Sequence, residues 1–236
     1  EGRPVPTSAW QSRKARDLLR ILTAQRGRPI SREQLAELLW PGEAPDRVGH
    51  RLSVQLSILR GVLDPHRRAP QDRYVVAERA SVALDTTYVE LDVELFRAEA
   101  TYGLRRFETG TGQDGADVLD LAERRYLGDF LADEPYDDWA VPVRDEARRL
   151  YLRVVRALAV LARRRGDLEQ ASSRLRRALE VDPYDEQTHR ELVAVLVAAG
   201  RHGEAEEAQR RYQRAMALLG LPAQPQNLPA RPGTVP

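Results

Sequence analysis

Residues 47–63 read RVGHRLSVQLSILRGVL, and the spacing of their apolar side chains predicts one amphipathic helix. The apolar stripe has members at steps of three and four residues: Val48, Leu52, Leu56, Leu59 and Leu63. The opposite face carries His50, Arg51, Val54, Ser57 and Ile58. Such a helix can bury one face and offer the other to the major groove of DNA, which admits a helix. Taken alone, the stretch is more typical of an ordinary surface helix with a solvated polar face.

The segments on either side of this helix change the interpretation. Residues 12–25 predict a first helix, and Ser31 with Gln34 forms a capping box for a second helix that reaches about Trp40. Residues 74–84, YVVAERASVAL, are rich in β-branched side chains and partly alternating, which predicts a hairpin. Three helices followed by a hairpin predict a winged helix. Its third helix would enter the major groove, and its hairpin would contact the neighbouring backbone or minor groove.

The composition limits the class of protein. The chain has 236 residues, enough for one large or two ordinary domains, and 42% of them are hydrophobic. It contains no cysteine, which excludes disulfides, thiolate metal sites and cysteine nucleophiles. No apolar run approaches the length of a membrane span, and residues 1–30 lack the apolar core of a signal peptide. We therefore expect a cytoplasmic protein without a membrane partner.

The net charge of +1 is unevenly distributed along the chain. Residues 1–87 hold 15 arginines and lysines against 10 acidic residues, whereas the remaining chain holds 22 against 26. A basic first third joined to an acidic remainder predicts an anion-binding module attached to a module with another task. Lys14 is the only lysine, and the planar guanidinium of arginine suits bidentate contacts with guanine or phosphate, although codon bias is a simpler explanation.

The second half of the chain is helical and contains a repeat. Gly166 and Gly200 are 34 residues apart, as are Ala171 and Ala205, and an apolar run precedes each glycine. This period and this placement of Gly and Ala are typical of tetratricopeptide repeats, helix pairs that stack and leave a surface for a partner. The sequence therefore predicts a mainly α protein with three parts: an N-terminal winged helix-turn-helix domain (residues 1–87), an all-α tetratricopeptide-like domain (88–220) and a Pro-rich tail (221–236).

Two long stretches resemble a known family. They are RPISREQLAELLWPGEAPDRVGHRLSVQLSILRGVLDP, residues 28–65, and YLGDFLADEPYDDWAVPVRDEARRLYLRVVRALAVLARRRGDLEQA, residues 126–171. Together they resemble the antibiotic-regulatory (SARP) type of bacterial transcriptional activator, which joins an OmpR-like winged helix to a bacterial transcriptional activator domain. The resemblance implies that residues 47–63 read a direct-repeat promoter element in double-stranded DNA. It also implies that the helical domain supports a homodimer or contacts RNA polymerase holoenzyme.

The resemblance implies that four residues lie at groove-facing positions, His50, Arg51, Val54 and Ser57, and that Arg60 matches a Leu-Arg pair common in the family. We also expect Ser53 and Arg79 to contact DNA. Arg60 is implied either to contact a phosphate or to brace the fold, and Arg79 is the hairpin residue nearest to a phosphate-binding position. The chain departs from the family pattern at Ile58 and Gly61, where relatives often carry arginine. The hairpin also lacks the Gly-Tyr turn that is usual in the family. Fewer arginines on this helix predict weaker binding with a flatter salt dependence.

The sequence shows no catalytic motif, and we expect neither enzymatic activity nor a cofactor. It has no glycine-rich phosphate loop and no HExxH motif, and its four histidines lack the spacing of metal ligands. The acidic loop GDFLADEPYDD, residues 128–138, lacks the ligand spacing of an EF-hand, so helix capping and solvation explain it better than a cation site. We interpret the three tryptophans as core or interdomain packing: Trp10, Trp40 and Trp139.

Two functional hypotheses remain. In the first, the chain is a DNA-binding transcriptional activator that reads promoter repeats with its third helix. In the second, it is a protein-interaction module of a larger regulator, with weak or no DNA binding of its own. Ile58 and Gly61 favour the second hypothesis, whereas the positive charge of residues 1–87 opposes it.

Overall fold

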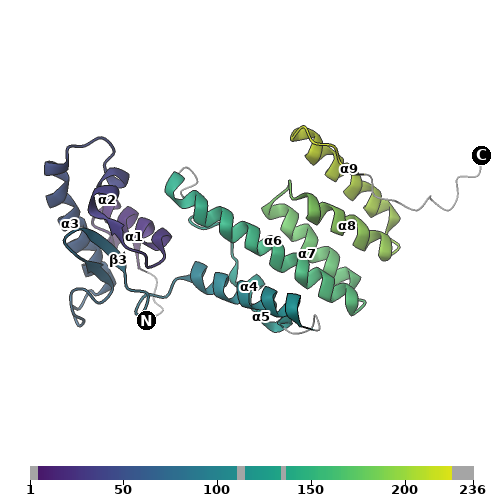
Figure 1. Cartoon of the computed structure of the whole chain (residues 1–236), viewed down its shortest axis with the longest axis horizontal. Helices are drawn as coiled ribbons and strands as arrows, with labels where there is room; N and C mark the ends of the chain where they lie inside the picture. Colours follow the sequence, from purple (N-terminus) through teal and green to yellow (C-terminus); the bar gives the residue numbers. More distant parts are fainter. Residues whose placement is uncertain (1–4, 111–114, 134–136, 225–236) are drawn as a thin grey trace, which may run out of the picture. The chain divides into compact units, whose positions relative to one another are not determined.

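The computed structural model describes residues 5–110, 115–133 and 137–224, and it is mainly helical (Figure 1). The chain divides into two compact units. The first runs to Leu95 and also includes Leu131–Val143, whereas the second contains Phe96–Phe130 and the chain from Arg144 onward. Among the described residues, no helix has both the length and the apolar character needed to cross a membrane.

The first unit is a winged helix, as the sequence predicts. It contains three helices, which are α1 (Arg13–Gln25), α2 (Arg32–Leu39) and α3 (Pro45–Leu63). A 3-10 turn at Thr7–Ala9 precedes them. Strands β2 (Val75–Ala77) and β3 (Ser81–Leu84) form the antiparallel hairpin, with Val75 opposite Leu84 and Ala77 opposite Val82. A third strand, β1 (Ile30–Ser31), pairs with the other edge of β3 and gives the strand order β1-β3-β2.

The boundaries of α2 and α3 follow from local chemistry. Ser31 caps α2 through the predicted capping box, because its hydroxyl accepts the Gln34 amide proton while the Gln34 side chain accepts from the Ser31 backbone amide. Helix α3 begins at Pro45, two residues before the predicted start. Proline is favoured in the first helical position, where its missing N–H leaves no bond unmade.

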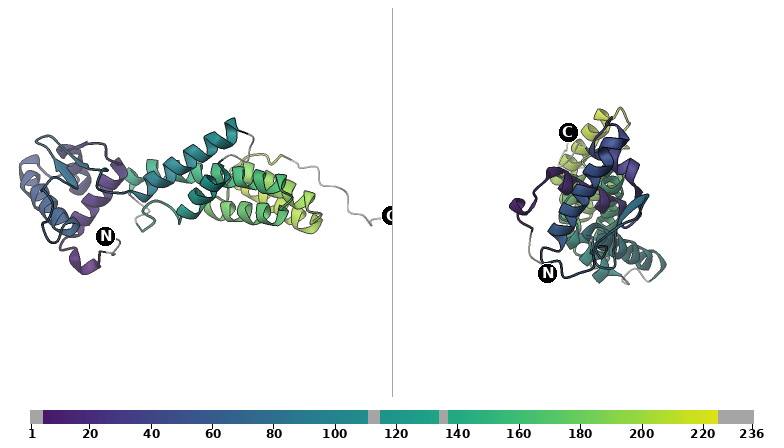
Figure 2. Two further views of the ribbon diagram at one scale, coloured as in Figure 1. Left: turned by 90° about the horizontal axis from the view of Figure 1, so that it is seen from below. Right: turned by 90° about the vertical axis from the view of Figure 1, so that its left-hand side faces the viewer.

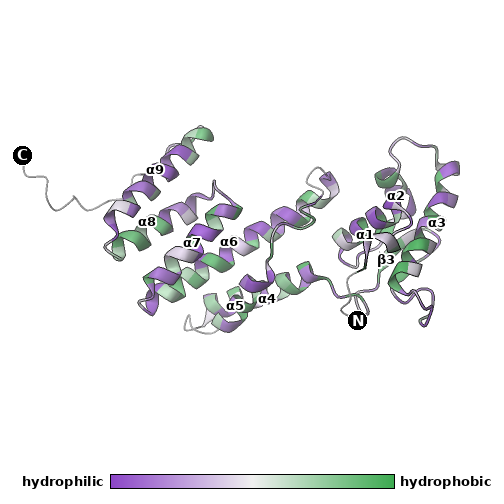
Figure 3. Ribbon diagram, turned by 180° about the vertical axis from the view of Figure 1, so that it is seen from behind, coloured by the Kyte–Doolittle hydropathy of each residue, from purple (hydrophilic) through white to green (hydrophobic). Residues whose placement is uncertain are grey.

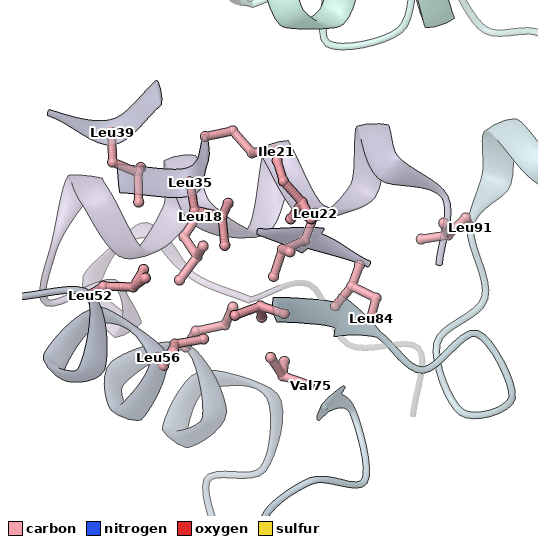
Figure 4. Close-up of a cluster of buried hydrophobic side chains, with 13 residues drawn as sticks. Leu18, Ile21, Leu22, Leu35, Leu39, Leu52, Leu56, Val75, Leu84 and Leu91 are labelled. Carbon is pink, nitrogen blue, oxygen red and sulfur yellow. The ribbon is translucent and has the colours of Figure 1, made fainter. Parts of the chain in front are cut away.

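The core of the first unit lies between its three helices and the small sheet (Figure 4). Leu52, Leu56 and Leu59 of α3 enter it, so the predicted apolar stripe is buried. Leu63 is only partly buried, and Val62 is buried at the end of the helix instead. The three tryptophans pack against this same core: Trp10, Trp40 and Trp139. The packing interpretation of the tryptophans is therefore confirmed, and Trp139 reaches the core from a segment 76 residues beyond Leu63.

The helical unit is built mainly from six helices: α4 (Asp92–Thr109), α5 (Ala116–Arg125), α6 (Val141–Arg164), α7 (Leu168–Val181), α8 (Glu186–Ala198) and α9 (His202–Leu218). The first turns of α4 and α6 belong to the winged unit, as does a 3-10 turn at Asp138–Ala140. Helix α4 is close to α5, because a Cβ on the buried Gly103 would lie 2.8 Å from Leu119.

The 34-residue repeat corresponds to two helix pairs, α6–α7 and α8–α9 (Figures 1 and 2). Gly166 and Gly200 lie at the turn inside each pair with φ of +79° and +70°, a backbone conformation that glycine adopts without strain. Ala171 and Ala205 are both fully buried in one core with Leu192 and other side chains of α8. The tetratricopeptide-like prediction is confirmed. Most of the predicted Pro-rich tail, residues 225–236, lies outside the described residues.

Candidate nucleic-acid interface

Helix α3 presents two different faces within the winged unit. Val48, Leu52, Leu56 and Leu59 are each at most 3% exposed and face the core. The predicted DNA-contacting residues of this helix, apart from Arg60, are exposed: His50, Arg51, Ser53, Val54 and Ser57. Val54, an apolar residue, is 41% exposed. The winged unit therefore leaves one face of its longest helix uncovered, with a mixed basic, polar and apolar character.

Most of this face is unpaired. His50, Val54 and Ser57 make no side-chain hydrogen bond or ion pair with any residue that the structure describes. Ser53 donates its hydroxyl proton to the Gly49 carbonyl at 3.0 Å, a local bond within the helix that still leaves the oxygen free to accept. These side chains can meet an external partner without first breaking tertiary contacts.

Arg51 is held by a neighbour that the sequence analysis did not single out. Its guanidinium pairs with the carboxylate of Glu43, in the loop before α3, and lies 5.7 Å from the centre of the Trp40 ring. Both charged side chains are exposed, at 48% for Arg51 and 40% for Glu43. An exposed pair of this kind is weak and can exchange for another anion. Glu43 thus competes with any phosphate or base for Arg51.

Arg60 ties α3 to the hairpin. It pairs with Asp72 and donates from Nη2 to the Val75 carbonyl at 3.0 Å, where β2 begins. Its side chain is only 18% exposed, and its buried Nε has no hydrogen-bond partner in the described chain. Of the two roles that the resemblance implies, these contacts match the bracing role. A phosphate contact would require Arg60 to leave Asp72.

Arg79 lies in the turn of the hairpin. The turn is fixed by its neighbours, since the Glu78 amide donates to the Ser81 carbonyl at 2.9 Å. The Arg32 side chain also donates to the Glu78 carbonyl at 2.9 Å. Arg79 itself is exposed and forms no ion pair or side-chain hydrogen bond with the residues that the structure describes. It is therefore a free cation on a well-anchored turn.

A hollow of about 330 Å³ lies beside the C-terminal half of α3. Its lining includes Ser57, Gly61 and Arg67, together with the loop that follows the helix. Asp64 shapes this loop by accepting the Ala69 amide at 2.8 Å. Backbone hydrogen bonds from Ala69 and Arg68 lower the pKa of the Asp64 carboxyl below its ordinary value. Gly61 contributes no side chain to this part of the lining.

Sequence reasoning missed two exposed arginines, Arg47 at the start of α3 and Arg67 beside the hollow. Neither side chain pairs with an acid in the described part of the chain. The signal available from sequence was only their charge, because their positions depend on where α3 begins and how the following loop turns. Each adds a cation near one end of the exposed face of α3.

In the described part of the acidic loop, the Asp129 carboxylate already has partners within the chain. Asp129 accepts a hydrogen bond from the Tyr126 hydroxyl at 3.0 Å and pairs with Arg148. Among the described residues, no group of three or more His, Asp or Glu side chains is arranged to hold a metal ion. Glu134, which the sequence analysis included in this loop, lies outside the described residues. The Asp129 carboxylate serves to fix the chain between α5 and α6.

Comparisons with known proteins agree with this architecture. Residues 91–226 match the family described as the bacterial transcriptional activator domain, and residues 7–80 match that described as transcriptional regulatory protein, C terminal. The first match covers more than half of the chain, so the chain belongs to the bacterial transcriptional activator domain family. Both matching families are thus families of transcription regulators rather than of enzymes, and the second of them describes a winged helix that binds DNA.

Among solved structures, the chain is similar to Mycobacterium tuberculosis EmbR in complex with a low-affinity phosphopeptide, with a TM-score of 0.78 and 23% identity. The match covers 95% of this chain and 58% of the EmbR chain, so this chain spans little more than half the length of that protein. A tetratricopeptide-containing C-terminal domain of a Plasmodium falciparum FK506-binding protein is also similar, with a TM-score of 0.42 and 18% identity over 56% of this chain and 81% of that one. No curated protein sequence matches the chain.

Proposed function

We propose that the chain is a sequence-specific transcriptional activator that places α3 in the major groove of promoter direct repeats. The observation that carries this proposal is the uncovered face of α3, where His50, Val54 and Ser57 have no partner among the described residues. In this proposal the helical unit supports dimerisation or contacts RNA polymerase holoenzyme. No cofactor or catalytic group takes part.

The side chains on this face have the chemistry needed to distinguish base pairs. Arg51 can donate two hydrogen bonds to the O6 and N7 atoms of guanine, and Val54 can contact the methyl group of thymine. His50, Ser53 and Ser57 supply donors and acceptors that suit either base edges or phosphates. The face thus combines one strong polar contact with an apolar one.

Arginine side chains beside this face would position the protein on the duplex by contacting phosphates. Arg79 on the hairpin turn would contact a phosphate, and Arg60 would brace the hairpin or contact a phosphate after leaving Asp72. Residues 1–87 contain 15 cationic and 10 acidic residues, and this excess of positive charge supports such an electrostatic contribution. Each phosphate contact releases counterions, so the binding constant should fall as salt rises.

A fluorescence-anisotropy titration of this protein on short labelled duplexes, repeated at several salt concentrations, tests the proposal. We expect the logarithm of the binding constant to fall linearly with the logarithm of salt, by about 0.9 for each phosphate contacted. We also expect one duplex sequence to bind at least about a thousandfold more tightly than unrelated DNA. A salt slope near zero, with equal affinity for every duplex, would contradict the proposal.

The alternative is a protein-interaction module of a larger regulator with weak or no intrinsic DNA binding. The specific observation in its favour is that two of the candidate cations are already neutralised, Arg51 by Glu43 and Arg60 by Asp72. Ile58 and Gly61 add no charge in their place. The same titration separates the two functions, because the alternative predicts only weak binding without sequence preference.

A further inference from the structure

The helical unit carries an open groove on its last three helices. The groove has a volume of about 600 Å³ and lies between α7 and α9, with α8 beneath it. Leu192 and Leu196 of α8 are buried at its base, and Leu179 of α7 is part of its wall. At its open end Leu218 of α9 is 77% exposed, and the C-terminal end of α9 is apolar in Figure 3. One surface therefore contains both an apolar hollow and an apolar projection.

The charges along this side of α9 change sign from one end to the other. Glu204 and Glu207 line the groove in the first half of the helix, and Arg211 and Arg214 line it in the second half. Ala208 and Ala215 also line the groove, but both are buried against the chain's own core. An antiparallel copy of such a helix would bring acidic residues beside basic ones at both ends.

The charges that line the groove already have partners within the chain. Glu204, 49% exposed, pairs with Arg176 of α7 at 2.7 Å and with Arg201 at 2.6 Å. Glu207 contacts both Arg211 and Arg214 at 3.3 Å, and all three side chains are at least 41% exposed. Exposed ion pairs contribute little and exchange readily. In an antiparallel pair the same charges would satisfy one another between chains instead of within one chain.

We propose that this groove is a self-association surface, in which α9 of a second copy lies antiparallel along α9 of the first. The inference rests on the dimerisation part of the proposed function and assigns a surface to it. The pairing is isologous, so every contact occurs twice about a two-fold axis. Leu218 of each copy enters the groove of the other and serves as the apolar anchor. The proposed contact involves only the helical units and does not specify how the winged units are arranged on DNA.

Sedimentation velocity of this protein over a concentration series, without DNA, gives the first test. We expect a monomer–dimer equilibrium, and we expect Leu218→Gln to raise the dimer dissociation constant about a hundredfold because two anchors are lost together. Leu127→Gln is the matched control, since Leu127 is 95% exposed elsewhere in the same unit and should change nothing. Circular dichroism checks that both variants retain the helical content of the unchanged protein.

A charge-swap experiment tests the antiparallel arrangement. One variant carries Arg211→Glu with Arg214→Glu, and a second carries Glu204→Arg with Glu207→Arg. Each variant alone has a single sign of charge along the groove side of α9 and should be monomeric. An equimolar mixture should form a heterodimer, because an all-acidic helix then faces an all-basic one.

The proposal is overturned if the unchanged protein is monomeric up to about 100 µM, or if its dimer is equally sensitive to Leu218→Gln and Leu127→Gln. It is also overturned if the mixed charge variants stay monomeric while each remains folded. Failure here is distinguishable from failure of DNA binding. Anisotropy titration on a duplex with one half-site measures the affinity of the winged unit whether or not the helical units associate.

Discussion

Arg51 on the exposed face of α3 is paired with Glu43, eight residues earlier, above the ring of Trp40. The pair places an acid next to the side chain that we propose to contact guanine. In the proposed complex, DNA must displace Glu43 before Arg51 can contact a base. We therefore expect the pair to lower the affinity for DNA in general, and only a DNA site that contacts the released Arg51 should recover the difference.

Glu43→Gln should strengthen binding to any duplex. Removing one exposed ion pair frees up to about 1 kcal/mol, which corresponds to an affinity gain of roughly fivefold at most. The salt slope should stay about the same, since the released Arg51 contacts a base and the number of phosphates contacted does not change. Anisotropy titration measures both quantities. Glu90→Gln removes the same charge from another exposed position of the winged unit, and an equal effect of that control would show that net charge alone is responsible.

Arg79→Ala should weaken binding to all duplexes by a similar factor. Arg79 is a free cation of the hairpin turn in the described chain, and a phosphate contact carries no sequence information. The salt slope should become shallower by about 0.9. The measurement compares the preferred duplex with an unrelated one at several salt concentrations. If the ratio of the two affinities changes severalfold, Arg79 contacts bases rather than the backbone.

Leu52→Ala should destabilise the winged unit by about 2–5 kcal/mol, because Leu52 is 1% exposed and its loss leaves a cavity in the core. Urea unfolding followed by tryptophan fluorescence is the appropriate measurement. Trp10, Trp40 and Trp139 all pack against this core, so the signal reports the winged unit specifically. Val54→Ala, on the exposed face of the same helix, should change stability by no more than about 0.5 kcal/mol. Equal effects of the two substitutions would show that the two faces of α3 are wrongly assigned.

Glu191→Gln should stabilise the protein at neutral pH. Burial raises the pKa of the Glu191 carboxyl in α8, so folding favours its protonated form. The stability contributed by that proton is present below the unfolded pKa of about 4.3 and is lost as the pH rises through the higher folded value. Glutamine keeps a neutral side chain at every pH. Thermal unfolding by circular dichroism should give a higher Tm for the variant at pH 7, and the advantage should disappear at about pH 4 and below.

Much of the fold could be predicted because its signals are local. The apolar steps of Val48, Leu52 and Leu56 define α3, and the equal spacing of Gly166 and Gly200 defines the repeated helix pair. These patterns depend on three or four neighbouring residues or on one fixed period. Both patterns can therefore be recognised without knowledge of the tertiary contacts.

The remaining features depend on contacts between distant residues. Strand β1 has only two residues, too few for a periodic signal, and it exists because Ile30 meets Val82. Trp139 packs in the first unit although the sequence around it reads as part of the second. The neutralisation of Arg51 by Glu43 likewise depends on how the loop before α3 folds. The residues of the candidate interface could thus be named from sequence, whereas their existing partners could not.

We propose that the uncovered face of α3 reads DNA sequence. The decisive experiment is selection of bound molecules from random duplex DNA, carried out in parallel with the unchanged protein and with Arg51→Ala. We expect a spaced direct repeat for the unchanged protein and a loss of preference at one guanine of each half-site for the variant. Recovery of no common sequence, or of the same sequence from both proteins, would contradict it.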